Sequence, residues 1–146
     1  DYMSQMKNDE EMVGVVIAAH AYDVQRYRKM NYRFDRVRYH EDVDVTLQIL
    51  RSGFPNIICH KYVRVQPPQQ GEGGCSEYRN ADNWNRATLK LLSLHKAYLR
   101  ERWKPMDKEK AESWGGIEGQ PTGHPVVYAK KAYKEACRAN NLPSVI

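Results

Sequence analysis

Three carboxylates stand close together where one amphipathic stretch begins. In the run "HEDVDVTLQIL", Glu41 and Asp42 are adjacent, and Asp44 follows two places later. A helix start stabilises an acid through its unpaired N–H groups and its dipole, each by about 0.3–1 kcal/mol. Asp42 stands at the expected N-cap, and Asp44 is explained as an ordinary first-turn acid. Glu41 is then one acid more than a cap needs.

The surplus acid indicates acid–base chemistry. Arg36, Arg38 and His40 precede the pair, and cations so close hold a carboxylate in its ionised form. An ionised carboxylate at the mouth of a site can take a proton from an alcohol. Asp42 is therefore the candidate catalytic base, and Glu41 is the candidate for orienting it.

A second group of chemically capable residues lies in the glycine-rich stretch "QGEGGCSEYR", residues 70–79. Glycines let the backbone approach a phosphate closely, an arginine can pair bidentately with a diphosphate, and a tyrosine ring can stack on a base or sugar. The candidate donor-binding residues are Gly73, Gly74, Cys75, Ser76, Tyr78 and Arg79. The alternative is a solvent loop in which the glycines only turn the chain.

Cationic and aromatic side chains alternate over residues 25–40, "QRYRKMNYRFDRVRYH". Cations meet phosphates and rings stack on exposed bases, so this segment is the candidate contact with nucleic acid. The candidate residues are Arg28, Arg33, Arg36, Arg38, Tyr39 and His40. In the alternative interpretation, the rings belong to the core and the cations are solvated. A second basic group, between Lys90 and Lys110, is expected to be a solvated helix face with its tail, and the alternative is that it extends a track of phosphate contacts.

Hydrophobic spacing predicts the elements that must position these residues. Apolar residues recur at helical intervals after Asp42 until Gly53 and Pro55 end the helix, and again in residues 81–103, where Asp82 or Asn83 is the expected cap. The expected strands cover 12–22 and 56–66, the helices cover 42–53, 81–103 and 126–141, and the loops cover 23–40, 67–80 and 104–125. Strands that alternate with helices predict an α/β layered domain.

Composition limits the class of protein. Hydrophobic residues make up 41% of the 146 residues, which is enough for the core of one domain and excludes global disorder. The formal net charge of +5 favours polyanionic partners. Three cysteines without a C-x-x-C pair argue against a disulfide framework and favour a reducing, cytoplasmic compartment. No apolar run approaches the ~18 residues of a membrane span, so no membrane partner is expected.

The acidic stretch resembles a segment of the GT-A type glycosyltransferases. In those enzymes a pattern with F-D, then E-D-x-D-x-x-L, then G-Y/F carries the catalytic acid at the start of a helix. The matching residues here are Phe34, Asp35, Glu41, Asp42, Asp44, Leu47, Gly53 and Phe54. With "GGCSEYR", "WGGIEG" and "KKAY", the pattern is similar to that of the phage glycosyltransferases associated with TET/JBP-type DNA base hydroxylases. The resemblance covers residues 12–135.

This resemblance implies both a fold and an activity. Residues 1–146 would form the acceptor-side, C-terminal half of a GT-A-like mixed-sheet layered domain that lacks its N-terminal nucleotide-binding part. The enzyme would move a sugar from a nucleotide-sugar donor to a hydroxymethylated pyrimidine, such as hydroxymethylcytosine, in phage DNA. It would act in the cytoplasm of the infected host, and the piece alone would be inactive.

The resemblance also implies a divalent metal, Mn or Mg, held mostly by residues outside this chain. His60, after the strand "NIIC", and Asp1, as the last acid of a D-x-D strand, are the candidate ligands. A lone histidine on a strand is otherwise structural. Two rival functions stay open: a non-catalytic basic DNA-binding module in which the acidic turn is only a cap, and a glycosyltransferase that acts on polysaccharide or protein.

Overall fold

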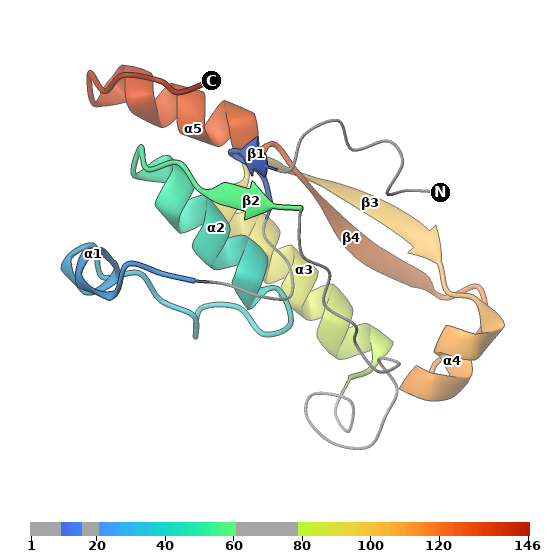
Figure 1. Ribbon diagram of the computed structural model, residues 1–146. Coiled ribbons are helices and arrows are strands. Elements are labelled where there is room, and N and C mark those ends of the chain that lie inside the picture. The colour runs from blue at the N-terminus through green and yellow to red at the C-terminus, as the bar shows by residue number, and fades with distance from the viewer. Residues whose placement is uncertain (1–9, 16–20, 61–78) are drawn as a thin grey trace. The chain divides into compact units, whose positions relative to one another are not determined.

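The structure is a computed structural model that describes residues 10–15, 21–60 and 79–146, and it divides into two compact units. The first unit lies within Asp1–Arg36, Asp42–Val65 and Tyr128–Ile146. The second lies within Val37–Glu41 and Gln66–Val127. In its described residues, each unit combines helices with one two-stranded antiparallel sheet (Figure 1).

The first unit is built on a short sheet and two amphipathic helices. Its elements are β1 (Glu10–Met12), α1 (Val24–Lys29), nearly all of α2 (Glu41–Arg51), β2 (Ile57–Cys59) and α5 (Ala129–Ala139). β1 and β2 pair with Glu11 opposite Ile58. The Asn56 side chain extends this pairing, because it accepts from the Gly14 N–H and donates to the Gly14 carbonyl, at 3.1 and 2.9 Å.

Helix α2 begins at Glu41 and buries the stripe that contains Val43, Leu47 and Leu50. It ends before Gly53, whose φ of 79° lies in the left-handed region that glycine adopts without strain. Gly53 is also tightly packed, since Leu142 Cδ1 lies 2.6 Å from the place that a Cβ would occupy. The predicted helix is therefore confirmed, and its C-terminal end is fixed by backbone geometry as well as by packing.

The second unit places a long helix against a β-ribbon. Its elements are α3 (Ala81–His95), β3 (Leu99–Pro105), α4 (Lys108–Trp114) and β4 (Pro121–Val127). β3 and β4 pair along their whole length, from Leu99 opposite Val127 to Pro105 opposite Pro121. Trp84 of α3 joins the helix to the ribbon, because its Nε1 donates to a carbonyl of β4, that of Gly123, at 2.7 Å.

Several elements differ from the expected ones. The predicted strand over 12–22 is wrong in its described part, because β1 ends at Met12 and Val13 has a positive φ of 63°; residues 16–20 lie outside the described ranges. Residues 23–40, predicted as a loop, contain the short helix α1. The loop predicted over 104–125 is also wrong, because it contains α4 and most of β4. The Gly and Pro residues that predict a loop here belong to a β-ribbon.

Other elements agree in position but not in length. α3 ends at His95, where 81–103 was expected, and the cap is Asn80, whose side chain accepts from the Asn83 N–H at 2.8 Å. α5 and the start of the second strand are confirmed with shorter bounds. The described chain is thus mixed α/β with small antiparallel sheets, and a GT-A-like layered domain stays a prediction. Within the described ranges, no helix combines the length and the apolar character that crossing a membrane requires.

Candidate functional site

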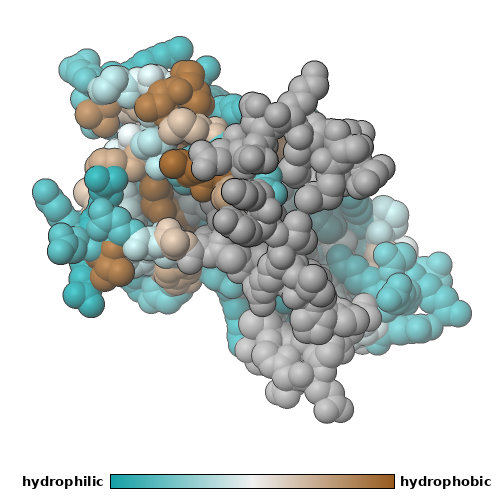
Figure 2. Space-filling model, viewed as in Figure 1, coloured by the Kyte–Doolittle hydropathy of each residue, from teal (hydrophilic) through white to brown (hydrophobic). Residues whose placement is uncertain are grey.

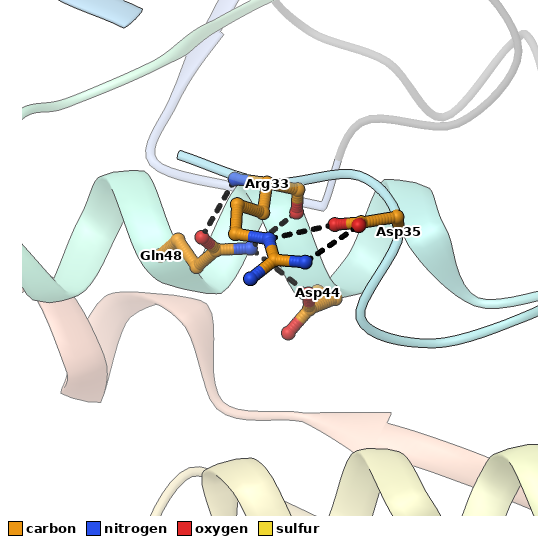
Figure 3. Close-up of polar contacts among 4 residues, drawn as sticks. All are labelled: Arg33, Asp35, Asp44 and Gln48. Atoms are coloured by element: carbon orange, nitrogen blue, oxygen red, sulfur yellow. Dashed lines mark hydrogen bonds and ion pairs between the residues drawn. The ribbon is translucent and has the colours of Figure 1, made fainter. Parts of the chain in front are cut away.

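Asp44, in the first turn of α2, is fully buried. Arg36 Nη2 lies 3.4 Å from Asp44 Oδ1. Gln48 Nε2 donates to Asp44 Oδ2 at 2.9 Å (Figure 3). A carboxylate away from water is tolerated only where a cation and hydrogen-bond donors replace its hydration. Asp44 is therefore a structural acid of the first turn, as predicted, and its burial with two side-chain partners is what the sequence did not reveal.

Gln48 also holds the segment that precedes α2. Its Oε1 accepts from the Arg33 N–H at 3.1 Å, and its Nε2 donates to the Arg33 carbonyl at 2.8 Å (Figure 3). The exposed Arg33 guanidinium turns to Asp35, with contacts of 2.8 and 2.6 Å. Gln48 thus fixes this segment beside the helix and lets Arg36 reach Asp44. Arg36, predicted to contact DNA, is occupied by a buried ion pair.

Glu41 and Asp42 are the first two residues of α2, so Asp42 is not the N-cap that was predicted. Asp42 is half-buried, and its Oδ1 accepts from the Val43 N–H at 2.7 Å, while Glu41 is exposed. Asp42 also acts on Tyr22: burial, then Tyr27, then Asp42 raise the pKa of the Tyr22 phenol to about 12. That phenol stays protonated at neutral pH, so it is a neutral neighbour of the carboxylate.

The aromatic residues of the first unit pack on one another. Tyr27 stacks on Phe34 with ring centroids 5.7 Å apart, and Tyr22 and Tyr32 meet this pair edge-on at 5.6–5.7 Å. Arg28, on α1, is exposed. The rings of residues 25–36 therefore pack on one another, as the alternative interpretation expects, while Arg28 and Arg33 stay exposed, so a contact of this segment with nucleic acid stays a prediction.

The second unit gathers rings and cations around Trp84. The ring centroids of His40, Trp114, Tyr39 and His124 lie 4.5, 5.3, 6.2 and 6.3 Å from that of Trp84. Lys110 Nζ lies 4.1 Å above the Trp114 ring, and Arg79 lies 5.9 Å above the Tyr39 ring. We call this group the tryptophan cluster: Tyr39, His40, Arg79, Trp84, Lys110, Trp114 and His124. It contains three of the predicted site residues, Tyr39, His40 and Arg79, and a fourth, Arg38, lies over the Tyr39 ring at 5.7 Å.

The cations of the tryptophan cluster repel one another. Burial lowers the pKa of Lys110, and Arg79 and Lys104 lower it further, although Asp107 opposes them. Burial also lowers the pKa of His124, with Lys110 as its next cause. Arg79 Nε is buried and has no hydrogen-bond partner among the described residues. Cations gathered in this way favour an anion, and the rings beside them can stack on a base.

His40 packs inside the second unit. It is 4% exposed, its Nε2 lies 2.9 Å from Thr88 Oγ1, and burial followed by the nearby His124 lowers its pKa to about 4. The ring is therefore neutral at neutral pH. The expectation that His40 is a cation beside the two acids is wrong, and its burial against Trp84 and Thr88 gives no support to a contact with DNA.

Several predicted site residues lie outside the described ranges: Asp1, Gly73, Gly74, Cys75, Ser76 and Tyr78. Their roles stay predictions. His60 is described, and its Nε2 lies 3.9 Å from Glu11 Oε2. Among the described residues, no three His, Cys, Asp or Glu side chains are grouped to hold a metal ion. His60 and Glu11 alone do not fit Mg or Mn, since Mg takes octahedral geometry, with about six mainly oxygen ligands, and Mn also prefers oxygen.

Trp84, Trp114 and His124 were not predicted as site residues, and Lys110 was predicted only as a member of the second basic group. Trp84 fitted the apolar stripe of a helix, and the other three lay in or beside a stretch assigned to a loop. One signal was available, because Trp114 is a large ring in a stretch otherwise rich in Gly and charged residues. A large aromatic ring in such a stretch is expected to pack against other side chains or against a bound ligand.

Two curated proteins resemble part of the chain. They are named beta-glucosyl-HMC-alpha-glucosyl-transferase, from Enterobacteria phage T2 and Enterobacteria phage T6, and each is 28% identical over 95 residues. The match covers 64% of this chain and 33% of each relative, so the chain spans about a third of the length of these relatives. It supports a relationship with phage glycosyltransferases. No family model matches the chain, and no solved structure matches it.

Removal of Arg36 should leave the Asp44 carboxylate buried without a cation. We expect Arg36→Gln to lower the free energy of unfolding by about 3–5 kcal/mol, and Asp44→Asn to cost less because Arg36 is partly hydrated. The double variant should lose less than the sum of the two. Urea denaturation measures all three, with the exposed Arg33→Gln as a control that changes stability little. Additive losses would show that the two side chains do not interact.

His40 should make stability depend on pH. The pKa of His40 is about 4 in the folded chain against 6.5 ordinarily, so between these values the unfolded chain binds a proton that the folded chain refuses. Stability should therefore fall as pH falls from 6.5 to 4, by up to about 3 kcal/mol from this residue, and this contribution should then level off. The free energy of unfolding, measured by urea denaturation at several pH values in this range, should depend less steeply on pH in His40→Gln than in the native chain. An unchanged slope would exclude His40 as the cause.

Proposed function

We propose that this chain is part of a glycosyltransferase that moves a sugar from a nucleotide-sugar donor to a hydroxymethylated pyrimidine in phage DNA. The observation that carries the proposal is the match to two phage proteins whose names contain glucosyl-transferase and HMC, the usual abbreviation of hydroxymethylcytosine. The net charge of +5 suits a polyanionic acceptor. The resemblance of the E-D-x-D segment to glycosyltransferases points to the same chemistry.

Within α2 we assign the proton transfer to Asp42. Asp44 is a poor candidate, because Arg36 and Gln48 occupy its two oxygens and no solvent reaches it. Asp42 stands in the first turn, where the helix dipole favours the ionised form, and it is only half-buried. In an inverting reaction it would take the proton of the acceptor hydroxyl as that oxygen attacks the sugar. Glu41 would orient Asp42 or bind the sugar.

We assign the leaving diphosphate to Arg79, together with the loop that contains Gly73 and Gly74. Negative charge develops on the diphosphate as the sugar departs, and cations held in place lower the barrier. The buried Nε of Arg79 has donor capacity that no described residue uses, and Lys110 adds a nearby charge. The proposed need for Mn or Mg rests on the family resemblance, since the described residues do not form a site for either ion.

The names of the two relatives add a second acceptor to the proposal. They describe transfer of an alpha-glucosyl group to beta-glucosyl-HMC, in which the accepting hydroxyl belongs to a sugar already on the base. Asp42 could take a proton from either kind of hydroxyl, because both are alcohols. The non-catalytic DNA-binding module remains the rival from another class, and polysaccharide or protein remains the rival acceptor.

An acceptor panel tests this proposal. The full product of the gene would be incubated with labelled nucleotide-sugars and one of five acceptors: hydroxymethylated duplex, beta-glucosylated hydroxymethylated duplex, unmodified duplex, polysaccharide or protein. We expect label on one of the modified duplexes and none on the unmodified duplex, with loss of transfer on chelation of divalent metal. Equal labelling of unmodified DNA, or labelling of polysaccharide or protein alone, would refute the DNA acceptor. DNA binding without any transfer would favour the module.

A further inference from the structure

The β3–β4 ribbon carries a row of cations to which the proposed chemistry gives no role. Arg100, Arg102 and Lys104 alternate along β3. Because successive strand residues point to opposite faces, these three lie on one face, spaced about 6.6–6.8 Å apart along the strand. The residues opposite them on β4 are Val126, His124 and Thr122. The one acid of β3, Glu101, falls on the other face by the same alternation.

The row is open to solvent. All of β3 except Leu99 is exposed, and in the described parts of the chain none of the three cations forms an ion pair. In Figure 2, hydrophilic colours dominate the surface around α4, which follows β3 in the chain. The pKa of His124 is lowered by burial, then by Lys110, Lys104 and Arg102, so these cations are close enough to act on one ring. Nothing described neutralises the row.

The chemistry of the surroundings favours nucleic acid as the partner. Duplex DNA carries one negative charge per ~1.7 Å of its axis, so a straight row of cations meets phosphates wherever it follows the backbone. A two-stranded ribbon is also narrow enough to enter the major groove. The tryptophan cluster adjoins the row through His124 and Lys110, and its rings could stack on an unpaired base. Acidic proteins offer charge but no bases.

We propose that the face formed by Arg100, Arg102 and Lys104 binds the sugar–phosphate backbone of duplex DNA. This inference rests on the proposed function only in taking DNA as the acceptor. Binding needs no sugar transfer, so it is measured separately. The inference also replaces the expectation that this basic group is a solvated helix face, because Arg100, Arg102 and Lys104 lie on a strand.

The test compares two variants with the same change in charge. Arg100→Gln/Arg102→Gln/Lys104→Gln removes the row. Arg86→Gln/Lys90→Gln/Lys96→Gln, called the α3 variant, removes three exposed cations from α3 and its C-cap in the same unit. Binding of the 146-residue chain to unmodified duplex is followed by fluorescence anisotropy over a range of salt. We expect the slope of log K against log salt to fall by about 2.7 in the row variant, because each lost phosphate contact removes about 0.9. The α3 variant should change far less.

Circular dichroism establishes that both variants are folded. If the row variant is not, the single Arg102→Gln variant replaces it, with an expected slope change of about 0.9. An unchanged slope in a folded row variant, an equal change in both variants, or no DNA binding by the native chain would overturn the inference. The inference would also be overturned if the native chain bound polyglutamate as tightly as DNA and the row variant lost both kinds of binding equally. Binding through the row without sugar transfer by the full gene product would refute the proposed function and leave the inference standing.

Discussion

The buried carboxylate of Asp44 is the constraint around which the start of α2 is organised. A charge without water must find a cation and hydrogen-bond donors, and Arg36 and Gln48 supply them. Gln48 also forms hydrogen bonds with both the N–H and the carbonyl of Arg33. The side chain that stabilises the buried charge therefore also orders the segment that leads toward the helix. The acid that precedes this anchor, Asp42, is thereby held in a defined position, which a proton-transferring group requires.

Trp84 has a comparable place in the second unit. Its indole N–H ties α3 to β4 through the Gly123 carbonyl, and its ring is the centre of the tryptophan cluster. The rings that pack the unit also hold Lys110 and Arg79 close together, at the cost of mutual repulsion. Cations under repulsion are stabilised when an anion binds, so the packing of this unit and its proposed affinity for phosphates have the same origin.

The sequence predicted features that depend on local residue spacing, and it did not predict features that depend on contacts formed in the folded chain. α2 was predictable, because its apolar residues repeat at helical spacing and Gly53 marks its end. The burial of Asp44 was not, since spacing cannot reveal that Arg36 folds back on it. β3 was missed because every residue in it except Leu99 is exposed, so no buried face marks a strand, and β4 was missed because its Gly and Pro residues resemble those of a loop. Arg79 and Tyr39 were predicted as site residues, but their neighbour Trp84 was assigned to the core.

We propose that neighbouring acids of one helix have different tasks, with Asp44 holding the structure and Asp42 moving the proton. Sugar transfer to modified DNA and the free energy of unfolding should be measured together for Asp42→Asn and Asp44→Asn in the full gene product. We predict that Asp42→Asn keeps its stability and its DNA binding but loses about 10²–10⁴-fold in transfer rate. Asp44→Asn should lose stability, and transfer only as far as it unfolds. Native-rate transfer by Asp42→Asn, or loss of transfer by a fully folded Asp44→Asn, would contradict this account.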